Sequence, residues 1–154
     1  MIVTPEPAPL VFFVTGEGLN FKAIFSACNE GKLNRTVALV ISNREQSNAL
    51  YWYKDNYILN SYSNSSTLGS AHTIDSVYLQ KLTEYKADWL ILAGYTWKIC
   101  SLVLNYFNNK VLNIQPSLLP EFGGKDMYDL NVHKASIVAK ESEFSSTIHL
   151  VNND

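Results

Sequence analysis

This sequence of 154 residues has only two cysteines. It has no long apolar run and no large excess of charge of either sign. The two cysteines, Cys28 and Cys100, lie far apart and lack metal-ligand spacing, whereas small secreted domains are usually richer in cysteine. No apolar run approaches the roughly 20 residues that cross a bilayer. We therefore expect a cytoplasmic protein with neither a metal centre nor a membrane partner.

The charge balance excludes a further class of protein. Twelve basic and fourteen acidic side chains give a net charge of −2, which offers no electrostatic attraction for nucleic acid. Hydrophobic residues make up 47% of the chain, which excludes a charge-dominated disordered protein. A chain of this length corresponds to about one domain. We expect a single domain over residues 1–154, with the proline-containing residues 1–9 as a flexible lead-in.

Apolar runs typical of buried strands alternate along the chain with segments of helical period. Strands are predicted at residues 10–15, 36–42, 57–60, 88–93, 110–115 and 146–151, helices at 20–29, 50–54, 75–86, 99–107 and 131–140, and surface loops at 61–70 and 121–129. This alternation predicts an α/β fold of the Rossmann-like, doubly wound type, a mainly parallel sheet with helices on both faces. Ligands of such folds bind at the carboxyl ends of the strands.

The turn between the first predicted strand and helix reads Gly16-Glu-Gly18-Leu19-Asn20. Its glycines let the backbone approach an anion, and the helix N-terminus supplies N–H groups. A dinucleotide fingerprint would need a third glycine where Phe21 stands, and the lysine of a P-loop is absent. The residues alone leave two interpretations open, an anion site and a tight turn with Asn20 as the helix N-cap.

Two carboxamides end a later strand. Asn113 and Gln115 alternate along it, so both side chains leave the same face. The segment Leu92-Ala-Gly-Tyr-Thr-Trp97 precedes them, and a proline-rich turn follows at residues 116–120. Such a pair can polarise a carbonyl group, or it can clamp the strand to the loop by hydrogen bonds.

In this order, the segments resemble the glycinamide ribonucleotide formyltransferases of purine synthesis. The resemblance extends from about Val11 to the last residue and rests on five segments. These are the strand, turn and helix of residues 11–28, Val40-Ile-Ser-Asn43, Asn113-Ile-Gln-Pro-Ser-Leu-Leu-Pro120 behind Leu92-Ala-Gly-Tyr, Gly123-Gly-Lys-Asp-Met-Tyr-Asp129 with Val132-His133, and Thr147-Ile-His-Leu-Val151.

The resemblance implies transfer of a formyl group from 10-formyltetrahydrofolate, a co-substrate, to the primary amine of glycinamide ribonucleotide, in a monomer or homodimer. A sugar amine or a charged tRNA is an alternative acceptor, although the near-neutral charge argues against tRNA. Attack by the amine leaves negative charge on the formyl oxygen, which the family stabilises with an asparagine amide and a histidine kept protonated by an aspartate. The implied site comprises Asn113 as this asparagine, the backbone of Gly18, Leu19 and Asn20 for the phosphate, and Thr96, Trp97, Lys98 and Ile99 for the pterin.

The chain departs from the family at several places. Gln115 stands at the family's histidine position, and a glutamine can donate a hydrogen bond but cannot carry charge or transfer a proton. The sequence ends at Asp154, before the family's aspartate is expected, and Leu19 replaces a serine. The alternative is therefore an impaired or inactive member that binds a phosphorylated ligand or has only a structural role. For His133 and His149 we weigh a structural role against replacement of the missing imidazole.

Overall fold

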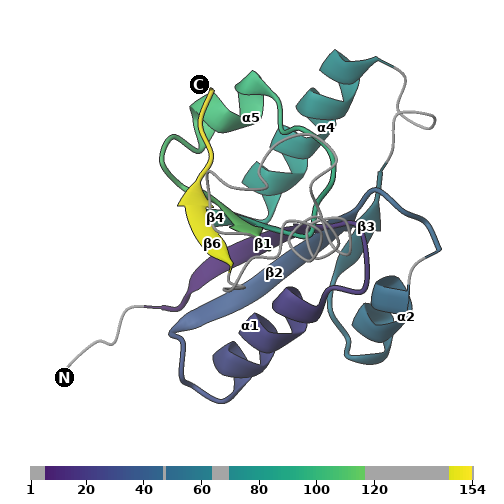
Figure 1. Cartoon of the computed structure of the whole chain (residues 1–154), viewed down its shortest axis with the longest axis vertical. Coiled ribbons are helices and arrows are strands. Elements are labelled where there is room, and N and C mark those ends of the chain that lie inside the picture. Colours follow the sequence, from purple (N-terminus) through teal and green to yellow (C-terminus); the bar gives the residue numbers. More distant parts are fainter. Residues whose placement is uncertain (1–5, 47, 64–69, 117–145, 154) are drawn as a thin grey trace, which may run out of the picture.

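The computed structural model describes residues 6–46, 48–63, 70–116 and 146–153 of the chain. These residues form one mixed β-sheet with helices on both faces (Figure 1). Its elements are β1 (Ala8–Val14), α1 (Leu19–Asn29), β2 (Arg35–Ser42), α2 (Asn48–Asp55), β3 (Asn60–Tyr62), α4 (Ala71–Glu84), β4 (Trp89–Ala93), α5 (Ser101–Tyr106), β5 (Val111–Gln115) and β6 (Thr147–Leu150).

The six strands follow the order β3-β2-β1-β4-β5-β6. All neighbouring pairs are parallel except β5 and β6, which are antiparallel. From β1 the chain first winds outward through β2 and β3, then returns to the other side of β1 and continues through β4 and β5. This is the predicted doubly wound, mainly parallel arrangement, and it places the topological switch point between β1 and β4.

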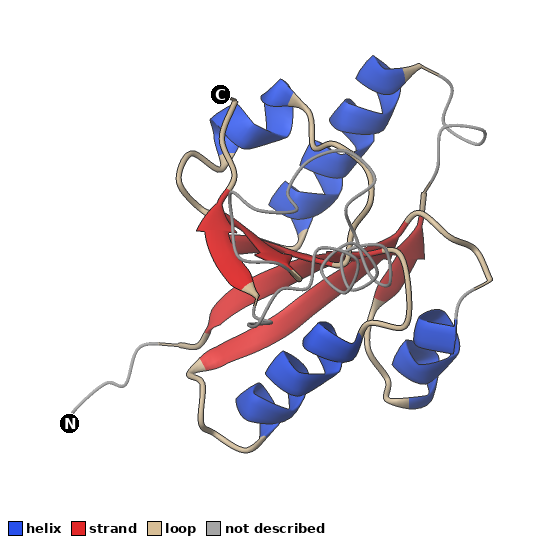
Figure 2. Ribbon diagram, in the orientation of Figure 1, coloured by secondary structure: helices blue, strands red, loops and turns tan. Residues whose placement is uncertain are grey.

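Each face of the sheet carries its own hydrophobic core. On one face, Phe13 and Leu92 pack with residues of α4 and α5, and on the other face Phe12 packs with Phe21 of α1 and Tyr53 of α2. The helices accordingly lie in two layers, α4 and α5 on one side of the sheet and α1 and α2 on the other (Figure 2). Because successive β1 residues face opposite sides, its apolar run without polar alternation is explained by burial on both faces.

Several predicted boundaries are wrong. The third strand is Asn60–Tyr62 rather than residues 57–60, because Tyr57 adopts a left-handed turn conformation (φ 57°) that ends the preceding helical region. Helix α4 begins at Ala71 rather than at residue 75, because Ser70 caps it by accepting a hydrogen bond from the Thr73 N–H. The predicted loop at 121–129 and helix at 131–140 lie outside the described residues.

Candidate functional site

Three strand ends bring the predicted site segments to one edge of the sheet. Strands β1, β4 and β5 are parallel neighbours, and their register aligns Val14 with Ala93 and Ala93 with Ile114. Adjacent strands lie about 4.8 Å apart, so the chain segments that leave these three ends start within about 10 Å of one another. Three segments are therefore neighbours: the turn of residues 16–20, predicted to bind phosphate and called the phosphate turn below, residues 96–99, predicted to face the pterin and called the pterin segment, and the carboxamides of β5.

The phosphate turn places a helix N-terminus at this edge. Gly18 is the N-cap of α1 and has left-handed dihedral angles (φ 67°, ψ 31°), so the alternative prediction of Asn20 as N-cap is wrong. The first hydrogen bond of the helix runs from the Lys22 N–H to the Gly18 carbonyl at 2.9 Å. The N–H groups of residues 19–21 precede this bond and are oriented to receive an anion. Leu19 is 73% exposed, so its apolar side chain stands beside them.

A pair of threonines joins this turn to the segment after β4. The Thr96 N–H donates to the Thr15 hydroxyl at 3.1 Å, and the two hydroxyl oxygens lie 3.3 Å apart. Thr15 follows β1 directly and is only 4% exposed, so the contact is anchored in the core. Thr96, one of the four residues predicted to face the pterin, thus connects the segment after β4 to the turn after β1.

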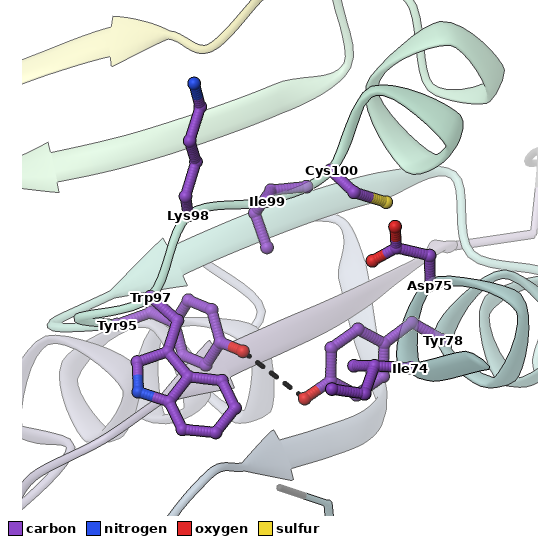
Figure 3. Close-up of a pocket in the computed structure, with 8 residues that line it drawn as sticks. All are labelled: Ile74, Asp75, Tyr78, Tyr95, Trp97, Lys98, Ile99 and Cys100. Atoms are coloured by element: carbon purple, nitrogen blue, oxygen red, sulfur yellow. Dashed lines mark hydrogen bonds between the residues drawn. The ribbon is translucent and has the colours of Figure 1, made fainter. Parts of the chain in front are cut away.

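The other three residues predicted to face the pterin line a pocket of about 250 Å³ between α4 and the segment after β4 (Figure 3). Ile99 is buried in it, Trp97 is 37% exposed at its border, and the Lys98 side chain extends away from the pocket's tyrosines. These three residues, predicted from one sequence segment, thus line the same pocket. The prediction missed the opposite wall, which α4 supplies through Tyr78 and its neighbours.

Two tyrosines form a hydrogen-bonded chain in this pocket. Tyr78 donates its hydroxyl hydrogen to the Ser63 carbonyl at 3.3 Å, so it accepts from the Tyr95 hydroxyl, also at 3.3 Å (Figure 3). Burial raises the pKa of both phenols, chiefly by desolvating the phenolate. Both hydroxyls therefore stay protonated at neutral pH and give the pocket fixed polar groups.

The cysteine in the pocket is a poor nucleophile. Burial, followed by a hydrogen bond with Asp75, raises the pKa of the Cys100 thiol. Figure 3 shows the sulfur and the carboxyl group of Asp75 facing each other. The neutral thiol reacts slowly because the thiolate is the reactive form of cysteine.

Asn113 faces an imidazole on the neighbouring antiparallel strand. It pairs with His149 in the β5–β6 register, and its Nδ2 lies 3.1 Å from the His149 Nε2. The His149 Nδ1 lies 3.0 Å from the Leu150 carbonyl oxygen, which can only accept. Nδ1 therefore carries the hydrogen of the neutral ring, and Nε2 accepts from the Asn113 amide.

The same pairing places Gln115 on the same face as Asn113, opposite Thr147. Asn113, Gln115 and His149 are all half-buried. The structure thus brings together the two carboxamides and one of the two candidate histidines, while His133 lies outside the described residues. The sequence left the direction of the His149 side chain open because its strand pairing was unknown.

Two further features concern the part of the chain that the structure describes. No cluster of three or more histidine, cysteine or carboxylate side chains suited to a metal ion occurs there. Within the same residues, no helix has both the length and the apolar character needed to cross a membrane.

Comparison with known proteins identifies the family. The sequence model described as formyl transferase matches residues 8–154. The chain belongs to this family. Among its relatives, the chloroplastic phosphoribosylglycinamide formyltransferase of Arabidopsis thaliana is 32% identical over 151 residues, covering 97% of this chain and 52% of the relative. The enzyme of Haemophilus influenzae is 29% identical over 145 residues, covering 94% of this chain and 66% of its own length.

Solved structures of family members share the fold. The glycinamide ribonucleotide transformylase 1 of Symbiobacterium toebii superposes with a TM-score of 0.90 at 27% identity, over 100% of this chain and 70% of that one. The corresponding protein of Geobacillus kaustophilus gives 0.87 at 31% identity, over 96% and 76%. The predicted family and fold are confirmed. The chain spans about half the length of the curated plant relatives it matches.

Proposed function

We propose that this member of the family transfers the formyl group of 10-formyltetrahydrofolate to the primary amine of glycinamide ribonucleotide, a step of de novo purine biosynthesis. It would act on these small molecules in the cytoplasm, as a monomer or homodimer. The observation that carries the proposal is the position of Asn113, at the sheet edge shared by the phosphate turn and the pterin segment. The family relationship supplies the reaction class.

The two substrates approach this edge from different loops. The ribonucleotide phosphate is bound by the backbone N–H groups around Gly18, Leu19 and Asn20, and the pterin lies against Trp97 and its neighbours. The hydrogen bonds between Thr15 and Thr96 fix the distance between these loops. Fixing both reactants in this way converts a bimolecular encounter into a reaction within one complex.

The reaction forms one C–N bond and breaks another. The amine nitrogen attacks the formyl carbon, and the electron pair of the C=O bond moves to oxygen. The Asn113 amide donates a hydrogen bond to this oxyanion, a contribution worth roughly 10²–10³ in rate. The intermediate then collapses, the C–N10 bond of the folate breaks, and N10 takes up a proton as the amine loses one.

His149 is a positioning residue in this proposal. Its Nε2 accepts one Nδ2 hydrogen of Asn113 and so fixes which end of the carboxamide faces His149. The second Nδ2 hydrogen is then directed by the same bond and can serve the oxyanion. A carboxamide already oriented by this hydrogen bond loses less orientational freedom when the transition state forms.

Gln115 gives this site a weaker donor than the imidazolium of the family. A neutral amide adds a hydrogen bond without positive charge, and it carries no proton to the leaving group. A positioned proton donor typically contributes a factor of about 10²–10⁴. We therefore expect turnover that is slow but above the uncatalysed rate.

A steady-state assay of tetrahydrofolate release tests the proposal. The purified chain should exceed the buffer rate when both substrates are present, and Asn113→Ala should reduce kcat by roughly 10²–10³. The matched control is Asn34→Ala, an exposed residue beside the start of β2 at the opposite edge of the sheet, which should leave kcat unchanged. A wild-type rate equal to that of buffer would refute formyl transfer by this chain and favour the ligand-binding alternative.

A further inference from the structure

Tyr53 carries a buried hydroxyl group that has no hydrogen-bond partner among the described residues. The residue lies on α2 and is 0% exposed. Its ring packs edge-on against Phe21 of α1, with the ring centroids 4.7 Å apart. Buried hydroxyls are normally satisfied, so an unpartnered one calls for a physical reason.

The hydroxyl lies against the glycine that caps α1. A Cβ atom built on Gly18 would come within 2.2 Å of the Tyr53 hydroxyl oxygen and 3.3 Å of the ring carbon that bears it. The phenol thus fills the space that any side chain at position 18 would need. It follows that the Tyr53 hydroxyl points at Gly18, the residue that caps α1 and whose carbonyl accepts the first helical hydrogen bond.

Two charged side chains beside the turn, those of Lys22 and Glu17, contact other side chains of the described residues. Lys22 lies over the Trp52 ring, 5.2 Å from its centroid. The carboxylate of Glu17 accepts a hydrogen bond from the Asn48 side-chain amide at 3.1 Å. Burial, and to a smaller extent the charge of Glu17, raises the pKa of Tyr53, so its hydroxyl remains a donor at neutral pH.

We infer that the Tyr53 hydroxyl is a ligand-binding donor, which hydrogen-bonds a phosphate oxygen of the phosphate ester held at Gly18, Leu19 and Asn20. The inference rests on the phosphate site of the proposed function and adds a side chain from a different helix to it. The hydroxyl is buried and has no partner among the described residues, and a phosphate oxygen supplies the missing acceptor. Gly18 permits this contact because no Cβ stands between the hydroxyl and the turn.

Tyr53→Phe removes only the hydroxyl, and Tyr51→Phe makes the same change at an exposed position of the same helix. Calorimetric titration with glycinamide ribonucleotide should show affinity weakened about tenfold or more for Tyr53→Phe, as expected for a lost bond to a charged group. Binding of the dephosphorylated riboside should be equal in both variants and the wild type. The ligand-free melting temperature of Tyr53→Phe should equal or exceed that of the wild type, because the hydroxyl it removes has no partner in the part of the chain that the structure describes.

Equal affinity of Tyr53→Phe and wild type for the ribonucleotide would overturn the inference, and so would a lower melting temperature of the ligand-free variant. Absence of binding by the wild type to both the ribonucleotide and inorganic phosphate would also overturn it. The proposed function fails separately: a wild type that binds the ribonucleotide more tightly than Tyr53→Phe, yet releases no tetrahydrofolate, refutes turnover and supports the inference. If the wild type and Tyr53→Phe both turn over with the same KM for the ribonucleotide, the proposed function is supported and the inference is refuted.

Discussion

Thr15 and Thr96, 81 positions apart in sequence, are joined by a hydrogen bond from the Thr96 N–H to the Thr15 hydroxyl at 3.1 Å and by a contact between their hydroxyls at 3.3 Å. The first residue begins the phosphate turn, and the second begins the segment that borders the pocket. Because Thr15 is almost fully buried behind β1, its hydroxyl is a fixed point to which the more exposed loop is attached.

Replacing Thr15 with valine should separate the two loops, because valine keeps the shape of the side chain and removes both contacts. Loss of the hydrogen bond from the Thr96 N–H lowers the free energy of unfolding by about 1 kcal/mol. The KM values for both substrates should rise together, since the change alters the relative position of their loops. Thr15→Ser, which keeps the hydroxyl, is the control. Urea unfolding and steady-state kinetics that do not distinguish the two variants would contradict this role.

His149→Phe should lower kcat about five- to tenfold with little change in KM, since it removes one hydrogen bond that orients the Asn113 amide. In a background of Asn113→Ala the same change should have no further effect, because a positioning residue acts only through its partner. His149→Gln, whose carboxamide oxygen can accept the same bond, should restore part of the rate. Additive effects of the two single changes on kcat would refute the positioning role.

Gln115→His should raise kcat by up to about 10²-fold if the rest of the site is intact, because it provides a group that can carry positive charge beside the oxyanion. Gln115→Asn serves as the control for a change of size without charge. The assay is the same release of tetrahydrofolate. An unchanged rate in the histidine variant would indicate that the residue at position 115 does not limit turnover.

The three tyrosines with raised pKa values predict loss of stability at alkaline pH. Tyr53, Tyr78 and Tyr95 hold their protons more firmly in the folded chain, so above about pH 10 the unfolded state loses protons first. Stability is therefore complete below pH 10 and falls as the pH rises further. Urea unfolding between pH 8 and 11 should show this slope, and Tyr95→Phe should reduce it, with the exposed Tyr106→Phe as control. Unfolding midpoints that do not change above pH 10 would contradict the prediction.

The order of strands and helices, and the family, could be predicted from the sequence because local patterns record them. Buried strands such as β1 and β4 appear as apolar runs, and their alternation with helical periods implies parallel pairing. The third strand was predicted at residues 57–60 and not at Asn60–Tyr62, because the residues of the actual strand are polar and its position depends on pairing with β2. The start of α4 was misplaced because the capping residue Ser70 lies within a serine-rich segment that indicated a loop.

The site could be predicted only in part. The segments that carry the predicted site residues could be recognised because each motif is local in sequence, and the strand order brings these segments to one edge of the sheet. The Tyr53 contact with Gly18, the Thr15–Thr96 bond and the Asn113–His149 pair each join distant parts of the chain. Such contacts follow from packing and strand register, and no local pattern encodes them.

The antiparallel pairing of β6 has a consequence for how the Asn113–His149 pair forms during folding. Side chains alternate along a strand, so a slip by a single position against β5 would bring Ile148 opposite Asn113 and turn the imidazole to the other side. A newly made chain can thus complete five parallel strands and its hydrophobic layers while Asn113 still lacks its acceptor. The proposed activity would then depend on whether the short strand β6 pairs with β5 in the correct register. A molecule with the wrong register would keep its secondary structure and hydrophobic cores, while the Asn113 side-chain amide would lack the hydrogen bond that orients it.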